Sequence, residues 1–357
     1  MTLRRFATAG AIAAFACLSI GACSLVQSLD YLQADLGKGP EEGGTGEAGG
    51  EGGVSPGAPI ASNQSAPDYL AQDATALYWL AGIDLMTVAK GGGEVRKIAS
   101  VPDASYLAVD PGAAGNVYLA VKKTVMSVPK SGGSPVPVFT GAGAPSLLAD
   151  TVHVDDESLF VLEVDTDEVA GFLRRMQKDG GAPELLSAAD GGAPAALVVD
   201  SKAAVWYDDT PVAFFSLAPR GAAGAAVSFP LGGGITSIAP TNQQIAMDAD
   251  TIFFVDSDDE ANTLVRARKR EAPGSATTIF RGTDEEFVSI ALSGTWIYAV
   301  EQVSGLVVRI PKAGGSPEVV VKDIKKPTSL VVDDAFIYFA EAAVASQGSI
   351  RKVPLPK

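Results

Sequence analysis

The sequence predicts an all-β fold built from seven copies of one four-stranded unit. Three features carry this prediction: a repeated aliphatic–aromatic pair, a short apolar run before each pair, and Gly-Gly turns after several of them. Successive aromatic residues lie 40, 42, 46, 47, 45 and 40 residues apart, and no long segment has helical periodicity. The seven pairs are Leu77-Tyr78, Val117-Tyr118, Leu159-Phe160, Val205-Trp206, Ile252-Phe253, Ile297-Tyr298 and Ile337-Tyr338.

Each unit reads as four strands joined by tight turns. The first strand ends in Asp, as at Asp110, and the second carries the aromatic pair. The third ends at a basic residue such as Lys130, and Gly132-Gly133 leads into the fourth. β-Branched and aromatic residues favour strands, and Gly supplies the positive φ angles that hairpins require. Four strands in 40–47 residues are typical of a propeller blade, so residues 61–357 are predicted to form a seven-bladed β-propeller of four-stranded antiparallel blades.

The last repeat has only three strands. After Ile350-Arg351-Lys352-Val353-Pro354 no fourth strand follows, and Ala58-Pro59-Ile60-Ala61 is available before the first repeat. We expect this segment to complete the last blade, because pairing would cover a bare strand edge and join the two ends of the chain. The alternative is that both ends fray.

The aromatic second strand carries a family resemblance. Leu77-Tyr78-Trp79 and its repeats resemble YWTD- and NHL-type propellers, and the plan is similar to propeller lipoproteins of Gram-negative envelopes. The resemblance covers nearly all of residues 68–357. It implies the fold rather than an activity, because propellers host many unrelated functions.

The N-terminus is expected to be an export signal. Arg4 and Arg5 precede an apolar stretch from Phe6 to Ile20, which is shorter than the roughly 20 residues that span a bilayer. Residues 1–22 are therefore predicted to be a signal peptide.

The end of this signal, Ile20-Gly21-Ala22-Cys23, resembles the lipobox of bacterial lipoproteins. The resemblance implies cleavage before Cys23, lipidation of its thiol and, since Ser24 follows, an outer-membrane location. The membrane is then a partner through the lipid on Cys23. A plain signal peptide that is cleaved elsewhere is the alternative.

Residues 23–60 are expected to form a flexible linker. From Gly37 to Gly57 the chain is rich in Gly and Glu and has almost no side chain that could pack. Cys17 would leave with the signal peptide and Cys23 would carry lipid, so no disulfide is expected.

Composition excludes several classes of function. The chain has 42 acidic and 27 basic residues, a net charge of −15, one His and two Cys. A basic nucleic-acid-binding face is not expected, nor is a multi-His metal centre or a disulfide scaffold. No G-x-S-x-G elbow, Walker loop or cysteine nucleophile is present in the mature chain, and no cofactor is predicted.

The loops between second and third strands share one face of the ring and concentrate acidic residues. We predict an acidic binding face for a basic protein partner, made of Glu163, Asp165, Asp167, Glu168, Asp208, Asp209, Asp256, Asp258, Asp259 and Glu260. Alternate spacing in Asp165-x-Asp167 and Asp256-x-Asp258 makes these four residues weak candidates for Ca²⁺ ligands, although a complete calcium loop is missing. Solvated turns are the alternative for all of them.

The opposite face is predicted to be basic. One basic residue follows the third strand in six repeats: Lys90, Lys130, Lys178, Arg220, Lys269 and Lys312. These residues would either face lipid headgroups or protect exposed hairpin edges from aggregation.

His153 lies on a first strand, where the other repeats carry Ala71, Ala108, Val198, Ala246, Ala291 and Val331. It is expected to be a packing residue, with a general base in the central channel as the alternative. Trp79, Trp206 and Trp296 are expected in the core between blades.

These observations predict a non-enzymatic envelope lipoprotein whose propeller is a binding platform. The alternative is a carboxylate-dependent hydrolase or lyase that acts on envelope glycans in the propeller funnel. A third interpretation is a structural spacer. Acidic residues that converge inside the channel would favour the enzyme, and a channel filled with Leu and Ala would disfavour it.

Overall fold

The computed structural model describes most of the chain after residue 52. The described residues are 53–141, 147–165, 170–190, 194–208, 214–219, 227–230, 241, 243–257, 262–270, 275–282, 285–343 and 347–357. The predicted signal peptide, Cys23 and most of the predicted linker lie outside them. No helix long and apolar enough to cross a membrane occurs in the described part of the chain.

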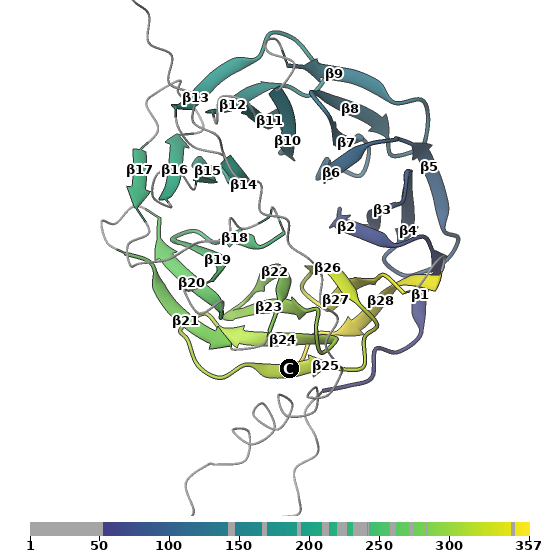
Figure 1. Ribbon diagram of the computed structural model, residues 1–357. Helices are drawn as coiled ribbons and strands as arrows, with labels where there is room; N and C mark the ends of the chain where they lie inside the picture. Colours follow the sequence, from purple (N-terminus) through teal and green to yellow (C-terminus); the bar gives the residue numbers. More distant parts are fainter. Residues whose placement is uncertain are drawn as a thin grey trace, which may run out of the picture. The chain divides into compact units, whose positions relative to one another are not determined.

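The described residues form seven four-stranded antiparallel sheets arranged as the blades of a ring (Figure 1). Blade 1 has β2 (Pro67–Gln72), β3 (Ala76–Ala81), β4 (Asp84–Ala89) and β5 (Arg96–Ser100). Blade 2 has β6 (Ala104–Val109), β7 (Asn116–Val121), β8 (Thr124–Pro129) and β9 (Val136–Thr140). Blade 3 has β10 (Leu147–Val154), β11 (Ser158–Asp165), β12 (Ala170–Gln177) and β13 (Glu184–Asp190). Blade 4 has β14 (Pro194–Val199), β15 (Ala203–Asp208), β16 (Phe214–Pro219) and β17 (Val227–Pro230).

The remaining blades follow the same order. Blade 5 has β18 (Ile245–Met247), β19 (Thr251–Ser257), β20 (Thr263–Lys269) and β21 (Thr277–Gly282). Blade 6 has β22 (Phe287–Ser293), β23 (Trp296–Glu301), β24 (Leu306–Pro311) and β25 (Glu318–Val321). Blade 7 has β26 (Pro327–Val332), β27 (Phe336–Glu341), β28 (Gly348–Pro354) and, as its outer strand, β1 (Pro59–Gln64). The predicted seven-bladed β-propeller is thus confirmed.

The ring closes as predicted. β1 pairs antiparallel with β28, with Ala61 opposite Ile350. One step earlier in the chain, Val54 forms a parallel bridge to Val321 of blade 6, through backbone hydrogen bonds of 2.9 and 3.1 Å. Residues at the start of the propeller therefore pair with the outer strands of blades 6 and 7, which come from the end of the chain.

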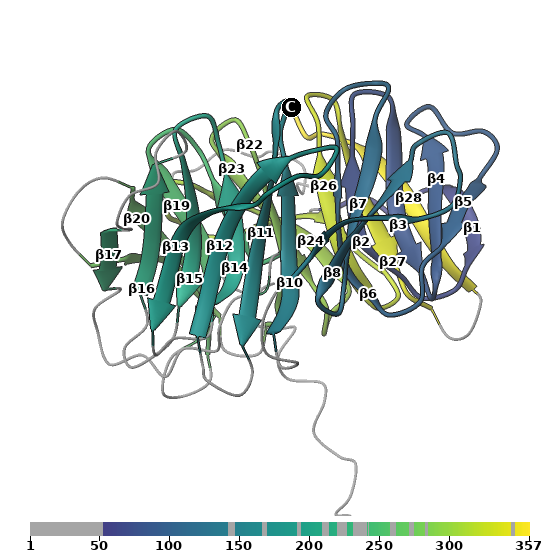
Figure 2. The ribbon, with the colours of Figure 1, turned by 90° about the horizontal axis from the view of Figure 1, so that it is seen from above.

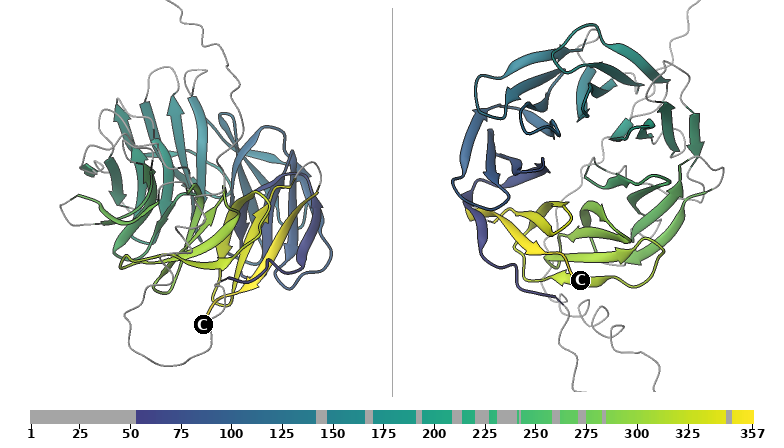
Figure 3. Two further views of the ribbon diagram at one scale, coloured as in Figure 1. Left: turned by 60° about the horizontal axis from the view of Figure 1, so that its bottom comes forward. Right: turned by 180° about the vertical axis from the view of Figure 1, so that it is seen from behind.

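The strands run across the thickness of the ring, so each blade has a turn at both faces (Figure 2). First-to-second and third-to-fourth turns share one face, which we call the hairpin face. Second-to-third turns and the links between blades lie at the other, which we call the linker face. The first strand of each blade lies nearest the central axis, as both directions of view along it show (Figures 1 and 3).

The strand register confirms the alignment of the repeats. His153 lies opposite Phe160, as Ala71 lies opposite Tyr78 and Ala108 opposite Tyr118. His153 is half-buried in this position.

The core is divided into clusters between and within blades rather than gathered in one centre. Leu80 and Leu85 of blade 1, for example, pack with Leu107 and Leu119 of blade 2. Trp79 and Trp206 are buried as predicted, whereas Trp296 is only half-buried at its edge of the core.

Candidate functional site at the central axis

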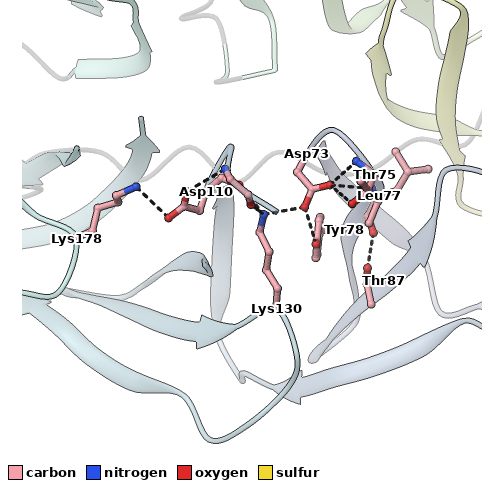
Figure 4. Close-up of polar contacts among 10 residues, drawn as sticks. Asp73, Thr75, Leu77, Tyr78, Thr87, Asp110, Lys130 and Lys178 are labelled. Atoms are coloured by element: carbon pink, nitrogen blue, oxygen red, sulfur yellow. Dashed lines mark hydrogen bonds and ion pairs between the residues drawn. The ribbon is translucent and has the colours of Figure 1, made fainter. Parts of the chain in front are cut away.

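The basic residues after the third strands do not form a free basic surface. In five blades of the described chain, the basic residue at or beside this position pairs with the Asp that ends the first strand of the preceding blade, and Figure 4 shows two of these pairs. Nitrogen–oxygen distances are 2.7 Å for Lys130–Asp73, 3.0 Å for Lys178–Asp110, 3.0 Å for Lys312–Asp248 and 3.1 Å for Lys90–Asp333, and Arg270 pairs with Asp200. The residues of the predicted basic ring therefore form ion pairs between neighbouring blades.

Two details of that prediction change. In blade 5 the paired cation is Arg270, while Lys269 is exposed and donates to the Thr251 hydroxyl. Arg220 lies outside the described residues. The spacing of the repeat hid this shift of one residue, because blade 5 has three consecutive basic residues.

The carboxylate of Asp73 contacts both its own first-to-second turn in blade 1 and Lys130 of the neighbouring blade 2. It accepts hydrogen bonds from the backbone N–H groups of Thr75 (2.7 Å) and Ala76 (2.8 Å) and from the Tyr78 hydroxyl (2.9 Å). Burial acts to raise the pKa of Asp73, but the hydrogen bonds from Lys130 and these turn groups outweigh it and lower the pKa to about 2.

The blade 6–7 interface lacks both members of the ion pair. Ser293 stands where the Asp would be, and Leu355 stands where the cation would be. Leu355 N–H donates to Ala335 O as Lys312 N–H donates to Thr295 O, both at 2.9 Å, so the two positions are equivalent. Leu355 packs in the apolar cluster that contains Trp296. At this interface both charged residues are replaced together, and the apolar packing of Leu355 takes the place of the ion pair.

The predicted acidic binding face needs a correction. Glu163 and Asp165 are on β11 and Asp256 is on β19, so they lie in strands rather than loops, and all three are buried. Glu163 pairs with Arg174, and Asp256 pairs with Arg266 at 2.8 Å. Glu163 and Asp256 therefore form ion pairs within their own blades and do not belong to an exposed acidic surface.

The side chains of the other predicted members of that face lie outside the described part of the structure. Asp208 ends β15, and nothing is described of its side chain. Asp167, Glu168, Asp209, Asp258, Asp259 and Glu260 lie outside the described residues. Of the four predicted Ca²⁺ ligands, Asp165 and Asp256 are buried in strands, and Asp167 and Asp258 lie outside the described residues. Within the described ranges, no three His, Cys, Asp or Glu side chains are placed to hold a metal ion.

Two other carboxyls differ from all of these. Asp68 and Asp150 lie near the linker-face ends of the innermost strands β2 and β10, and neither pairs with a Lys or Arg of the described chain. Asp68 accepts hydrogen bonds from the Tyr69 N–H (2.8 Å) and the Gln243 amide (3.2 Å). Asp150 accepts one from the Thr151 hydroxyl at 3.2 Å.

Aromatic rings and a cross-ring contact complete the group, which we call the axial cluster: Asp68, Tyr69, Tyr106, Asp150 and Gln243. The rings of Tyr69 and Tyr106 meet edge to face with centroids 5.7 Å apart. Gln243 enters from blade 5 and reaches Asp68 of blade 1, which lies three blades away around the ring. The cluster therefore extends across the axis.

Tyr69 has a strained backbone. Its φ is +53°, a left-handed conformation that bulky residues rarely adopt, and it lies in a bulge of β2 between Asp68 and Ala71. Such strain costs of order 1–3 kcal/mol and is concentrated at functional sites. Here it turns an aromatic side chain and a carboxyl toward the same cluster.

Burial disfavours the charged forms of the acidic groups in the axial cluster. Burial raises the pKa of both Asp68 and Asp150. Burial also raises the pKa of Tyr106 to about 12, with smaller contributions from Tyr69 and Asp150. For Tyr69, burial and then the charges of Asp68 and Asp150 raise the pKa. A bound cation or an added proton would offset the cost of burying these charges.

The aligned repeats contain a signal for this cluster. In the aligned first strands, Asp68 and Asp150 occupy positions where other repeats carry Ser105, Val288 and Thr328. Two acidic residues at a half-buried position that is otherwise uncharged mark a departure from the repeat, and departures from a structural repeat indicate function.

The fold and this site define a seven-bladed β-propeller with an acidic, aromatic centre. No protein-family model matches the chain, and no curated protein matches it. Among solved structures, it is similar to an oligogalacturonate lyase in complex with manganese (TM-score 0.61, 10% identity, 81% of this chain and 90% of that chain). It is also similar to YCF48 bound to D1 peptide (TM-score 0.59, 11% identity, 83% and 94%) and to a chain of the mitotic checkpoint complex (TM-score 0.61, 8% identity, 90% and 100%). At these identities the similarity shows the fold alone.

Proposed function

We propose that this protein is a non-enzymatic binding platform that recognises a basic segment of a partner protein at the axial cluster. The observation that carries the proposal is the contrast in pairing. Asp73, Asp110, Asp200, Asp248 and Asp333 each have a Lys or Arg partner, whereas Asp68 and Asp150 have none among the described residues.

The chemistry of the cluster favours a Lys or Arg side chain as its ligand. Two half-buried carboxylates attract positive charge, and their attraction is stronger there than in bulk water because the surroundings are less polarisable. The rings of Tyr69 and Tyr106 add faces on which an ammonium or guanidinium group can lie. An anion would meet like charge at the same place.

The position of the cluster supports a platform. It lies toward the linker face, where the acidic residues Asp167, Glu168, Asp258, Asp259 and Glu260 are predicted to add long-range attraction for a basic partner. One similar propeller is seen with a peptide bound, so the fold is compatible with peptide recognition. Lipidation of Cys23 and an outer-membrane location belong to the same proposal, and they rest on the lipobox resemblance.

A binding assay tests the axial cluster. The probe is a fluorescent (Lys-Arg)₃ peptide followed by anisotropy at physiological salt. The double variant D68N/D150N is expected to bind roughly tenfold or more weakly, because it removes two charge-assisted contacts. The control D156N/D334N removes the same net charge from exposed hairpins on the opposite face and is expected to change affinity by less than about twofold. Equal losses in the two double variants would refute the site.

The second candidate is a carboxylate-dependent hydrolase or lyase that acts on envelope glycans. The raised pKa values of Asp68 and Asp150 favour it, since a proton-donating carboxyl near a carboxylate is the requirement of glycan cleavage. One similar propeller is an oligogalacturonate lyase. Release of unsaturated or reducing ends from oligogalacturonate, with and without manganese, tests this candidate. Turnover that D68N/D150N abolishes would replace the platform with an enzyme.

A further inference from the structure

A cleft of about 550 Å³ opens between blades 1 and 2 on the hairpin face. The axial cluster lies toward the other face of the ring, the linker face. Ala76, Val88 and Ala113 give it a small apolar lining, and Tyr78 and Lys130 contribute polar groups. Its volume is in the range of sites for small molecules, about 300–1,000 Å³.

At two positions of the cleft, blade 1 has small residues where blades 6 and 7 have large ones. In blade 6 the same two positions hold Trp296 and Arg309, which stack with the guanidinium 4.1 Å from the ring centre. In blade 7 they hold Phe336 and Lys352, with the ammonium 3.7 Å from the ring centre. Blade 1 has Ala76 and Thr87 instead. The cation–aromatic pair that occupies these positions in blades 6 and 7 is therefore absent from blade 1.

One wall of the cleft is an insertion in the repeat. The first-to-second turn runs over seven residues from Asp110 to Asn116 in blade 2, whereas the equivalent turn in blade 1 runs over four residues from Asp73 to Ala76. Lys130 fixes the longer turn by donating to Asp110 O (2.6 Å) and Gly112 O (2.5 Å), as well as to Asp73. Figure 4 shows Lys130 between these two turns. Lys130 thus holds this wall in place, and its ammonium group donates three hydrogen bonds to do so.

Two charged side chains at the cleft lack partners. Glu94 and Arg96 line it, both are exposed, and neither makes an ion pair or hydrogen bond within the described chain. At the position of Arg96, blade 3 has Glu184 paired with Arg175, and blade 6 has Glu318 paired with Arg309, both at 2.5 Å. Opposite Arg96 is Thr87, which cannot neutralise it.

We infer that this cleft binds a small zwitterion of dipeptide size, with its carboxylate at Arg96 and its ammonium at Glu94. A simple anion would be repelled by Glu94, and a simple cation by Arg96. Alternate residues of an extended chain lie roughly 6–7 Å apart, which matches the roughly 7 Å between the ends of an extended dipeptide. The small apolar lining suits short side chains. This site is independent of the proposed axial function.

Three probes separate the two charges: dialanine, N-acetyl-dialanine without an ammonium group, and dialanine amide without a carboxylate. Binding is measured by isothermal titration calorimetry on the whole protein. Dialanine is expected to bind at least fivefold more tightly than either blocked compound, since each blocked compound loses one charge-assisted contact.

Variants assign each contact. E94Q is expected to weaken dialanine binding about fivefold without weakening N-acetyl-dialanine, an anion that Glu94 repels. R96Q is expected to weaken dialanine binding without weakening dialanine amide, a cation that Arg96 repels. E318Q in blade 6 is the control and should bind all three probes as the wild type does. Both cleft residues are exposed and unpaired, so the variants should fold normally. Absence of dialanine binding at millimolar concentration, or equal binding of the three probes, would overturn the inference.

Discussion

Replacing Lys130 with Met is expected to destabilise the propeller by about 3–5 kcal/mol at pH 7, because it strands the buried carboxylate of Asp73. The side chains of Lys130 and Asp73 are only 6% and 1% exposed, so water cannot replace the lost partner. The change also removes the bonds from Lys130 to Asp110 O and Gly112 O.

The lowered pKa of Asp73, to which Lys130 and the turn groups contribute, points in the same direction. It falls from 3.8 to about 2 on folding, a shift of nearly two units and therefore worth about 2 kcal/mol. Because the folded pKa is lowered, this stabilisation is complete above the ordinary pKa and is lost as pH falls from about 4 toward 2. In K130M, burial of Asp73 acts without a counter-charge. The difference between the wild type and K130M should therefore shrink at pH 3, where Asp73 is increasingly protonated in the variant.

Urea unfolding followed by tryptophan fluorescence, at pH 7 and pH 3, measures both effects. The control is K97M, which breaks an exposed pair with Asp84 and should cost less than about 1 kcal/mol. The double variant D73N/K130M should recover much of the loss, because no charge is left unpaired. A cost for K130M equal to that of K97M, or one that is the same at both pH values, would refute the reasoning.

Three further predictions concern closure, the altered interface and the axial site. G348A is expected to cost about 1–3 kcal/mol in thermal unfolding, because an added Cβ would lie 2.4 Å from a ring atom of Pro67 at the closure seam; an unchanged melting temperature would contradict it. For S293D/L355K, a double-mutant cycle should show a favourable coupling of about 1 kcal/mol, since the pair restores the ion pair of the other interfaces; zero coupling would mean that the positions do not meet. D68N/D150N should raise the free energy of unfolding at pH 7 by about 0.5–2 kcal/mol, since a pKa raised on folding destabilises the fold above its ordinary value; the gain should vanish near pH 3, and a loss at pH 7 would contradict the assigned direction.

The repeat made the fold predictable. A period set by Tyr78, Tyr118 and their equivalents fixes which residues share a strand position, and the three-stranded last repeat predicted that β1 would complete blade 7. Both predictions depend on local pattern and on the need to cover a strand edge, which sequence displays directly.

The partners of the charged residues were less predictable. Lys130 and Asp73 are 57 residues apart, and the sequence shows only that each belongs to its own repeat. Pairing between neighbouring blades follows from the three-dimensional offset of the blades, so the basic residues looked like a surface ring. Likewise, Glu163 looked exposed because it is near a turn, whereas Arg174 on the next strand draws it inside the blade.

The axial cluster was missed for a related reason. Asp68 and Gln243 are 175 residues apart and meet only because the ring brings blades 1 and 5 across the axis. Periodicity describes what the repeats share, and this site is made of what they do not share.

Carboxyl footprinting tests the binding role of the axial cluster most directly. The protein is labelled with a carbodiimide and glycine ethyl ester, with and without the (Lys-Arg)₃ peptide, and each carboxyl is read out by mass spectrometry. The peptide is expected to protect Asp68 and Asp150, while Asp156 and Asp334 label as they do without it. Protection confined to Asp167, Glu168 and Asp258–Glu260, with Asp68 and Asp150 unchanged, would contradict it and place the contact on the loops.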